Sequence, residues 1–151
     1  MMKAIIALAD FAETDPGGKA HIVGAGWSVT GPLQQPHAVV GFIQVPQDWA
    51  GKAVPFTLRL ADSNGQIVEV FGPAGPQPLE LGGQIEVREP EGWDKSTDLN
   101  LVFTVNVSVP LPSGHSYTWS LELDGKDLAS TTFFVRSVLS GSRVEHPSAS
   151  A

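Results

Sequence analysis

The residue types that do chemistry in proteins are few in this sequence of 151 residues, and they are widely spaced. The four histidines are His21, His37, His115 and His146. No two of them stand two or four positions apart, the spacing that presents two imidazoles to one zinc ion from a strand or a helix. Cysteine is absent, which excludes thiolate ligands, a cysteine nucleophile and disulfide bonds. We expect the histidines to be surface or strand-edge residues, and we predict neither a metal site nor a cofactor.

Two segments begin like ligand-binding motifs and then depart from them. Gly24-Ala25-Gly26 begins like a dinucleotide-binding fingerprint, but Val29 takes the place of the third glycine and no helix pattern follows to hold a pyrophosphate. The run from Asp62 to Gly65 begins like a calcium-binding loop, but its sixth position is Ile67 rather than glycine. The Gly-x-Ser-x-Gly elbow of hydrolases is also missing. We therefore predict no catalytic residues and a non-enzymatic protein, and a hydrolase with a dispersed triad is the weakest hypothesis.

The tryptophans are the strongest candidates for binding. Trp49 and Trp93 lie in polar, turn-like segments, where an exposed indole stacks on a sugar ring or anchors a protein interface. Loop tryptophans also fold back over a sandwich core, and this second interpretation is favoured. Trp27 and Trp119 lie in expected strands and are predicted to be core residues. The candidate partner-binding residues are Trp49, Trp93, Arg143, Val144, Glu145 and His146.

The charge balance excludes some partners. Nine basic and sixteen acidic residues leave a net charge of −7, which argues against binding to nucleic acid or to an anionic membrane surface. The segment from Asp62 to Asp98 contains eight acidic and two basic residues. It is either a carboxylate cluster for calcium or docking, or a solvated sheet face, and the outward alternation of its acids favours the solvated face. The apolar run from Ala4 to Ala9 is too short for a signal peptide or a membrane span, so we expect it to be the first strand of a soluble protein.

Most apolar residues recur with the two-residue period of a β-strand. From Asp98 to Val109 the odd-numbered positions are apolar and the even-numbered ones polar, and only Val102 breaks the pattern. The dipeptides Asn64-Gly65 and Asp124-Gly125 are typical of type I′ hairpin turns. Expected strands cover residues 3–9, 19–30, 38–45, 54–60, 67–70, 79–88 (bent or bulged at Gly82-Gly83), 98–109, 117–123 and 133–135.

These elements predict an all-β protein with no long helix. The expected fold is an antiparallel two-sheet β-sandwich of about eight or nine strands, immunoglobulin-like with Greek-key connections. It occupies residues 1–138. Residues 139–151, rich in serine and alanine, are expected to form a C-terminal tail that is flexible or docked on a partner.

Several short motifs support a family resemblance. They are Ala7-Leu8-Ala9-Asp10, Gly18-Lys19, Ile22-Val23-Gly24-Ala25-Gly26-Trp27-Ser28, the run from Leu111 to Trp119 and the Leu123-Asp124-Gly125 turn. With these motifs the sequence resembles, over about residues 3–136, a family of small uncharacterised proteins from actinobacteria and their tailed phages. The resemblance implies a compact β-sandwich of bacterial or phage origin. It supplies no catalytic residues.

The leading functional hypothesis is a structural or interaction protein. Its most specific form is a phage virion component, a capsid decoration or minor capsid protein, that binds capsid or other assembly subunits as a homo-oligomer or as part of a lattice. We expect it in the virion if a phage encodes it and in the cytoplasm otherwise. The alternative is a soluble bacterial module that binds carbohydrate or peptide through Trp49 and Trp93.

Overall fold

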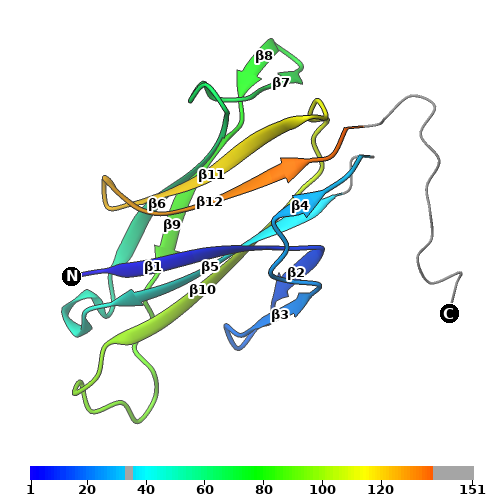
Figure 1. Cartoon of the computed structure of the whole chain (residues 1–151). Coiled ribbons are helices and arrows are strands. Elements are labelled where there is room, and N and C mark those ends of the chain that lie inside the picture. The colour runs from blue at the N-terminus through cyan, green and yellow to red at the C-terminus, as the bar shows by residue number, and fades with distance from the viewer. Residues whose placement is uncertain (33–35, 138–151) are drawn as a thin grey trace, which may run out of the picture.

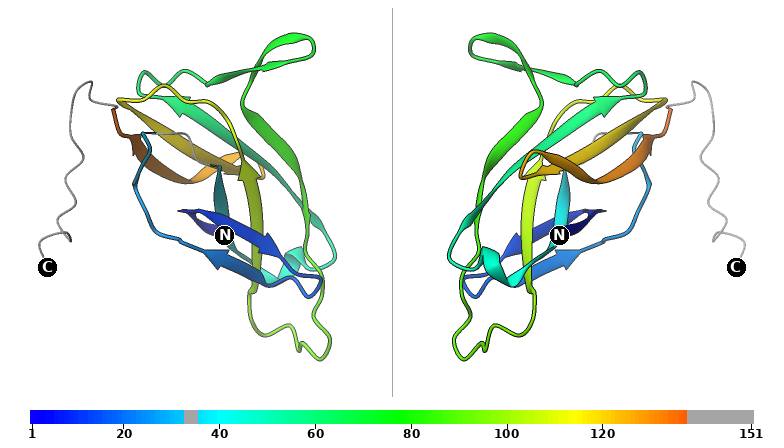
Figure 2. Two further views of the ribbon diagram at one scale, coloured as in Figure 1. Left: turned by 90° about the vertical axis from the view of Figure 1, so that its right-hand side faces the viewer. Right: turned by 90° about the vertical axis from the view of Figure 1, so that its left-hand side faces the viewer.

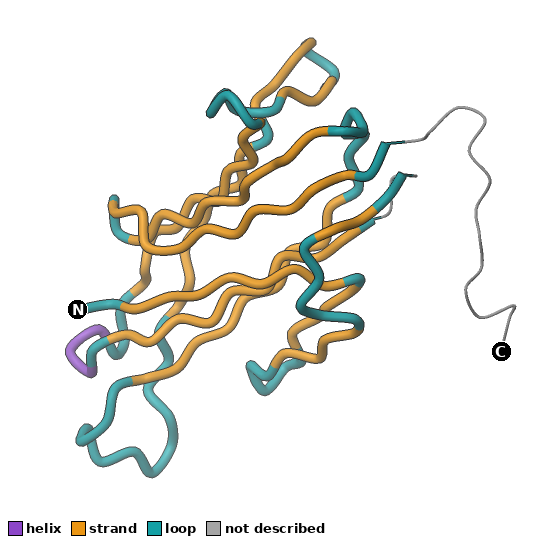
Figure 3. Tube along the Cα trace, in the orientation of Figure 1, coloured by secondary structure: helices purple, strands orange, loops and turns teal. Residues whose placement is uncertain are grey.

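The computed structural model describes residues 1–32 and 36–137, and this part of the chain is all-β. Its elements are β1 (Lys3–Ala9), β2 (Phe11–Thr14), β3 (Ala20–Val23), β4 (Val29–Thr30), β5 (His37–Val45), the 3₁₀ helix η1 (Gln47–Trp49), β6 (Ala53–Asp62), β7 (Glu69–Gly72), β8 (Gly75–Pro78), β9 (Glu80–Glu86), β10 (Leu99–Val107), β11 (His115–Leu123) and β12 (Lys126–Val135). Figure 3 shows strands throughout, with η1 at one end of the molecule. No helix within the described ranges has the length and apolar character needed to cross a membrane.

Two sheets face each other across the hydrophobic core. One has the strand order β1-β5-β10 and the other β4-β12-β11-β6-β9 (Figure 1). The hairpins β2–β3 and β7–β8 form two further two-stranded sheets. Neighbouring strands are antiparallel except for β4 and β12, which are parallel. The prediction of an all-β protein with antiparallel sheets is confirmed at this level.

The described residues form twelve strands rather than the expected eight or nine. The expected strand 19–30 is interrupted between β3 and β4 by Gly24 and Gly26, whose φ angles are 63° and 97°. The short strands β2 and β8 are additional. The hairpin expected around Asn64-Gly65 forms but is short. It consists of a bridge between Ala61 and Ile67 and a hydrogen bond from the Asp62 N–H to the Gln66 carbonyl at 2.8 Å, while residues 53–59 of β6 pair with β9.

The hydrophobic core follows the alternation predicted from the sequence. Along β11, Tyr117, Trp119 and Leu121 are buried and belong to the same cluster as Ile43 and Phe103 of the facing sheet. Removing such side chains from water contributes about 25 cal/mol per Å² of apolar surface, which is the main stabilising term in folding. The β11–β12 hairpin also forms as predicted, with positive φ at Asp124 and Gly125.

A stacked aromatic pair explains why two strand positions, Gly41 and Gly83, have no side chain. Phe56 and Phe103 stack across the sandwich with ring centroids 5.6 Å apart. A Cβ on Gly41 would collide with the ring of Phe103, and a Cβ on Gly83 would lie 3.1 Å from the Phe56 ring. The expected bend or bulge at Gly82-Gly83 is therefore wrong, because these residues keep a regular register with β6 and make room for an aromatic side chain instead.

The exception in the β10 pattern also has a structural cause. Val102 points away from the main core and packs against a second small cluster of Ala9, Ala12, Ala38 and Val40. The hairpin β2–β3 supplies Ala12 to this cluster, so part of the outer face of the three-stranded sheet is covered. An apolar residue is thus stable at a position where alternation alone predicts a polar one.

Candidate interaction surfaces

The hairpin β7–β8, called the arm below, is joined to the sandwich at its base. The Val68 N–H donates to the Leu60 carbonyl at 2.8 Å, and the Leu79 N–H donates to the Val68 carbonyl at 2.7 Å. Leu60 belongs to β6, so these bonds attach the arm to the five-stranded sheet. Figures 1 and 2 show that the arm beyond this base stands away from both large sheets.

The far end of the arm carries an exposed aromatic residue. Phe71 pairs with Pro76 next to the turn, and its side chain is 91% exposed. Leaving a phenylalanine side chain in water forgoes about 2 kcal/mol relative to burial. Aromatic residues are enriched among the anchors of protein interfaces, so the arm is a candidate partner-binding element. The sequence indicated a strand and turns here but gave no sign that the side chain would be exposed.

Trp49 and Trp93 lie at the opposite end of the sandwich from the arm. The Gly51 N–H donates to the Val87 carbonyl at 2.8 Å and joins the segment after η1 to the loop between β9 and β10; both segments lie at this end in Figure 3. The two indoles are half-buried and pack against the main core, as the fold-back interpretation predicted. The Trp93 indole N–H also donates to the Thr97 carbonyl at 3.2 Å.

A pocket of about 330 Å³ opens beside Trp49. Its apolar lining includes Met2, Leu123 and Leu128, and Lys126 contributes a charge. The Lys52 Nζ lies 5.9 Å from the centre of the Trp49 ring. An apolar surface with a charged rim suits a small amphipathic group, such as one side chain of a peptide or one sugar ring. Trp93 does not line this pocket.

The hairpin β2–β3 is held against the three-stranded sheet. The Asn106 side chain of β10 accepts a hydrogen bond from the Ala12 N–H at 3.3 Å and donates one to the Ala12 carbonyl at 2.7 Å. The hydroxyls of Thr14 and Thr104 bond to each other at 3.0 Å. These bonds fix the hairpin from a strand at least ninety positions away in the sequence.

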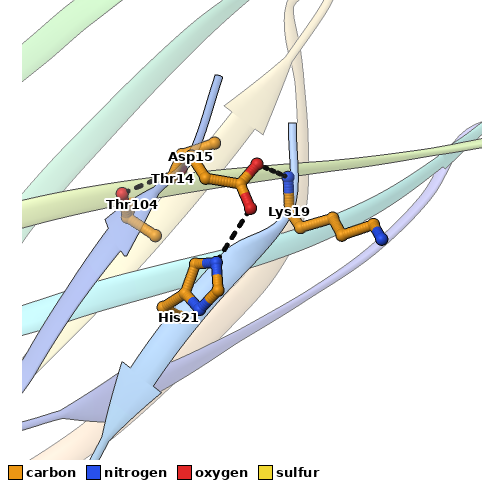
Figure 4. Close-up of polar contacts among 5 residues, drawn as sticks. All are labelled: Thr14, Asp15, Lys19, His21 and Thr104. Atoms are coloured by element: carbon orange, nitrogen blue, oxygen red, sulfur yellow. Dashed lines mark hydrogen bonds and ion pairs between the residues drawn. The ribbon is translucent and has the colours of Figure 1, made fainter. Parts of the chain in front are cut away.

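The turn of this hairpin contains a histidine–carboxylate pair, shown in Figure 4. One carboxylate oxygen of Asp15 lies 2.8 Å from the His21 Nε2, and the other accepts a hydrogen bond from the Lys19 N–H at 3.0 Å. The nearby threonine hydroxyls of Thr14 and Thr104 bond to each other rather than to the imidazole. The pair therefore orders the turn, since within residues 1–32 and 36–137 the ring is hydrogen-bonded to the Asp15 carboxylate and not to a hydroxyl, as it would be to a nucleophile.

The electrostatics of the turn agree with an ordering role. The hydrogen bonds from the Lys19 N–H and from His21 lower the pKa of the Asp15 carboxyl below its usual value. Within residues 1–32 and 36–137, no three histidine, aspartate or glutamate side chains come together as metal ligands would.

One histidine prediction is wrong. His37 is not at the surface but buried, at 5% exposure, and its Nε2 lies 3.1 Å from the Trp119 indole nitrogen, which donates the hydrogen bond. An imidazole nitrogen that accepts a bond carries no proton, so His37 is neutral with its proton on Nδ1. The two-residue period of β5 places His37 on the same face as Val39 and Ile43, and this signal could have revealed its burial. The prediction for Trp27 is partly correct. Its side chain packs against the core as expected, but the residue lies between β3 and β4 rather than in a strand.

The outer face of the three-stranded sheet carries an apolar patch. Ile5 of β1 lies opposite Phe42 of β5, and their side chains are 65% and 41% exposed. Phe42 in turn lies opposite Val102 of β10.

The remaining candidate binding residues, Arg143, Val144, Glu145 and His146, and the predicted tail as a whole fall outside the described residues.

Together, the facing sheets and their connections define an all-β, sandwich-like protein that exposes apolar side chains on the arm and on the outer face of the three-stranded sheet. Residues 4–136 match the model of DUF6941, a family of unknown function. The chain belongs to this family.

Other comparisons found little. No curated protein matches the chain. Among solved structures, a glycosyl hydrolase family 2 member from Bacteroides cellulosilyticus DSM 14838 is similar over 70% of this chain and 14% of its own length, with 14% sequence identity and a TM-score of 0.40.

Proposed function

We propose that this protein is a non-enzymatic structural or interaction protein that binds another protein through its arm. The observation that carries the proposal is the exposure of Phe71 on a hairpin that stands away from the sandwich. An apolar side chain in this position adds nothing to the core, and it gains its burial when a partner encloses it.

The most specific form of the proposal is a phage virion component, such as a capsid decoration or minor capsid protein. Its support is the resemblance to proteins of actinobacteria and their tailed phages. An acidic chain with a net charge of −7 also suits a protein that stays soluble until it binds its lattice.

The framework that presents the arm is proposed to be immunoglobulin-like. Two features support this topology. The strands β1, β5 and β10 form one sheet while β12, β11 and β6 are neighbours in the other, which corresponds to the A-B-E and G-F-C sets of such domains. The Tyr117 hydroxyl donates to the Pro112 carbonyl at 2.7 Å, as the tyrosine at the start of strand F does in many of them.

The test is cosedimentation of the purified protein with tailed-phage particles from the organism that encodes it, together with mass spectrometry of those particles. We expect the wild-type protein in the particle fraction and Phe71→Ser in the supernatant. Val23→Ser is the control, because Val23 is a similarly exposed apolar residue, 61% exposed, on the other hairpin. Absence of the protein from virions would contradict the virion proposal. Equal binding by wild-type protein and Phe71→Ser would contradict the role of the arm in binding.

A second candidate is a carbohydrate- or peptide-binding module, and the pocket beside Trp49 favours it. Titration with a panel of glycans and peptides would change the tryptophan fluorescence of the wild-type protein and much less that of Trp49→Phe. A flat response in the wild-type protein would count against this function.

A further inference from the structure

The imidazole of His37 lies in an aromatic cluster that joins the two large sheets. Its ring centroid is 5.8 Å from that of Trp27, 6.1 Å from that of Trp119 and 5.4 Å from that of Phe133. His37 begins β5 of the three-stranded sheet, whereas Trp119 and Phe133 belong to β11 and β12 of the other sheet. Trp27 belongs to the segment between β3 and β4. One titratable ring therefore contacts both sheets and this connecting segment.

Protonation of His37 is incompatible with its hydrogen bond to Trp119. An indole nitrogen is a donor only, and an imidazolium has two N–H donors and no acceptor. Because the Trp119 N–H donates to the His37 Nε2 at 3.1 Å, a proton on that nitrogen would place two donors against each other. The acidic form also carries a charge at a position that is only 5% exposed. Both effects destabilise the folded chain.

The elements packed around His37 bring few ionisable groups to it. Apart from His37 itself, β5, β10 with the following residues 108–114, and residues 24–30 contain none. The ionisable residues of β11, β12 and the position after β12 are His115, Tyr117, Glu122, Lys126, Asp127 and Arg136. Only Tyr117 among them is buried, and a phenol is uncharged in acid. On the described residues of these elements, therefore, no buried carboxylate compensates the charge of an imidazolium.

Residues 24–30, called the Trp27 segment below, are attached to the sheets by a short strand and one aromatic side chain. The strand β4 has two residues and lies beside β12 at the edge of the five-stranded sheet (Figure 1). The indole of Trp27 packs against Phe133 with ring centroids 5.9 Å apart. Its N–H is buried without a hydrogen-bond partner among the described residues. Release of this indole to water would satisfy a donor that the folded state leaves unpaired.

We infer that the hydrogen bond between His37 and Trp119 is an acid-sensitive switch that controls the attachment of the Trp27 segment. At neutral pH the imidazole accepts from Trp119 and packs against Trp27. In acid it takes up a proton and loses this bond. Trp27 is half-buried on a largely exposed segment, so its displacement brings water to the imidazolium without separating the two large sheets. The switch involves no residue of the arm and is independent of the proposed binding function.

Urea denaturation as a function of pH tests the proton coupling. A histidine in an unfolded chain has a pKa of about 6.5, so a folded state that excludes its proton is fully stabilised above this pH and loses stability below it. Between pH 8 and pH 5 we expect the equilibrium constant for unfolding to rise about tenfold more in the wild-type protein than in His37→Gln. The glutamine amide oxygen can accept from Trp119 and does not titrate. His115→Gln, at an exposed position, is the control and should keep the wild-type pH dependence. Parallel profiles of the wild-type protein and His37→Gln would overturn the inference.

Amide exchange in the wild-type protein locates the opening and does not depend on the folding of a variant. The N–H groups of Phe134 and Arg136 donate to carbonyls of the Trp27 segment at 2.9 and 2.8 Å. We expect their protection factors to fall by about tenfold between pH 7 and pH 5. The Val87 N–H, which bonds to a different segment at 2.8 Å, should change much less. An equal loss at Val87, or unchanged protection at Phe134 and Arg136, would overturn the inference.

Discussion

The two hairpins outside the large sheets differ in how they are held. The hairpin β2–β3 lies against β10, where Asn106 bonds both backbone groups of Ala12 and the hydroxyls of Thr14 and Thr104 meet. The arm is attached through the hydrogen bonds of Val68 and Leu79 and through Val70, which packs against the main core, and its far end presents Phe71 to solvent. Both hairpins have four-residue strands.

The comparison shows that a short hairpin acquires its position from tertiary contacts rather than from its own strands. Two strands of this length are marginally stable in water when isolated. One hairpin gains stability from a side chain distant in sequence and contributes to the covering of the sheet. The other gains it near its base, so its far end is exposed to solvent.

The largest change in the free energy of unfolding is expected for Asn106→Ala, which tests how the hairpin β2–β3 is held. The substitution leaves the Ala12 N–H and carbonyl without their partner, and we expect the free energy of unfolding to fall by about 1–3 kcal/mol. Urea denaturation measures the loss, and limited proteolysis within residues 15–18 reports whether the hairpin is released. Asn100→Ala, at an exposed position of the same strand, is the control. Equal stability of the two variants would show that Asn106 does not hold the hairpin.

Tyr117 tests whether the base of the arm is as firmly held as β2–β3. Together with Val68 and Glu69 it lines one pocket at this base, and its hydroxyl donates to the Pro112 carbonyl at 2.7 Å. Tyr117→Phe should lower the free energy of unfolding by about 1 kcal/mol and increase amide exchange at Val68. A change in exchange confined to residues far from the arm would contradict this arrangement.

The same residue gives a pH prediction. Burial, and secondarily the charge of Asp62, raises the pKa of the Tyr117 hydroxyl above its ordinary value of 10.0. The folded state thus favours the protonated phenol, and this contribution to stability is complete below the unfolded pKa and is lost as the pH rises through the folded pKa. Tyr117 is the single tyrosine, so its ultraviolet titration is directly assignable. We expect the midpoint to fall when urea unfolds the protein; an unchanged midpoint would refute the shift.

Asp15→Asn should have a smaller, local effect. The wild-type carboxylate orders the turn above its pKa in the unfolded chain, ordinarily 3.8. This order is lost as the pH falls through the lowered pKa of the folded state. We expect the protection factor of the Lys19 amide to decrease in acid in the wild-type protein and to be less dependent on pH in the variant. Parallel pH profiles for the two proteins would contradict the role of the carboxylate.

Phe71→Ser should have the smallest effect on stability. The side chain makes no contribution to the core, so we expect the free energy of unfolding to change by less than about 0.5 kcal/mol. Urea denaturation checks this, and a loss comparable to that of Asn106→Ala would mean that the arm packs on the sandwich rather than standing away from it.

Much of the fold could be predicted from the sequence because strand periodicity is a local property. The alternation in residues 117–123 identified β11 and its buried face, and Asp124-Gly125 identified the turn that follows. The same alternation could have shown that His37 is buried. The partner of each strand was harder to predict. The Asn64-Gly65 turn indicated a hairpin, and a short one forms, but most of β6 pairs with β9, which is distant in the sequence.

The sequence by itself determined which segments are strands and which face of each is apolar, since both depend on neighbouring residues along the chain. Only the tertiary structure decided which apolar side chains remain uncovered. Val102 and Phe42 follow similar local patterns, yet the hairpin β2–β3 packs over the first and leaves the second exposed. Burial depends on which distant segments come to lie over a surface, and that is a property of the assembled chain rather than of any local run of residues.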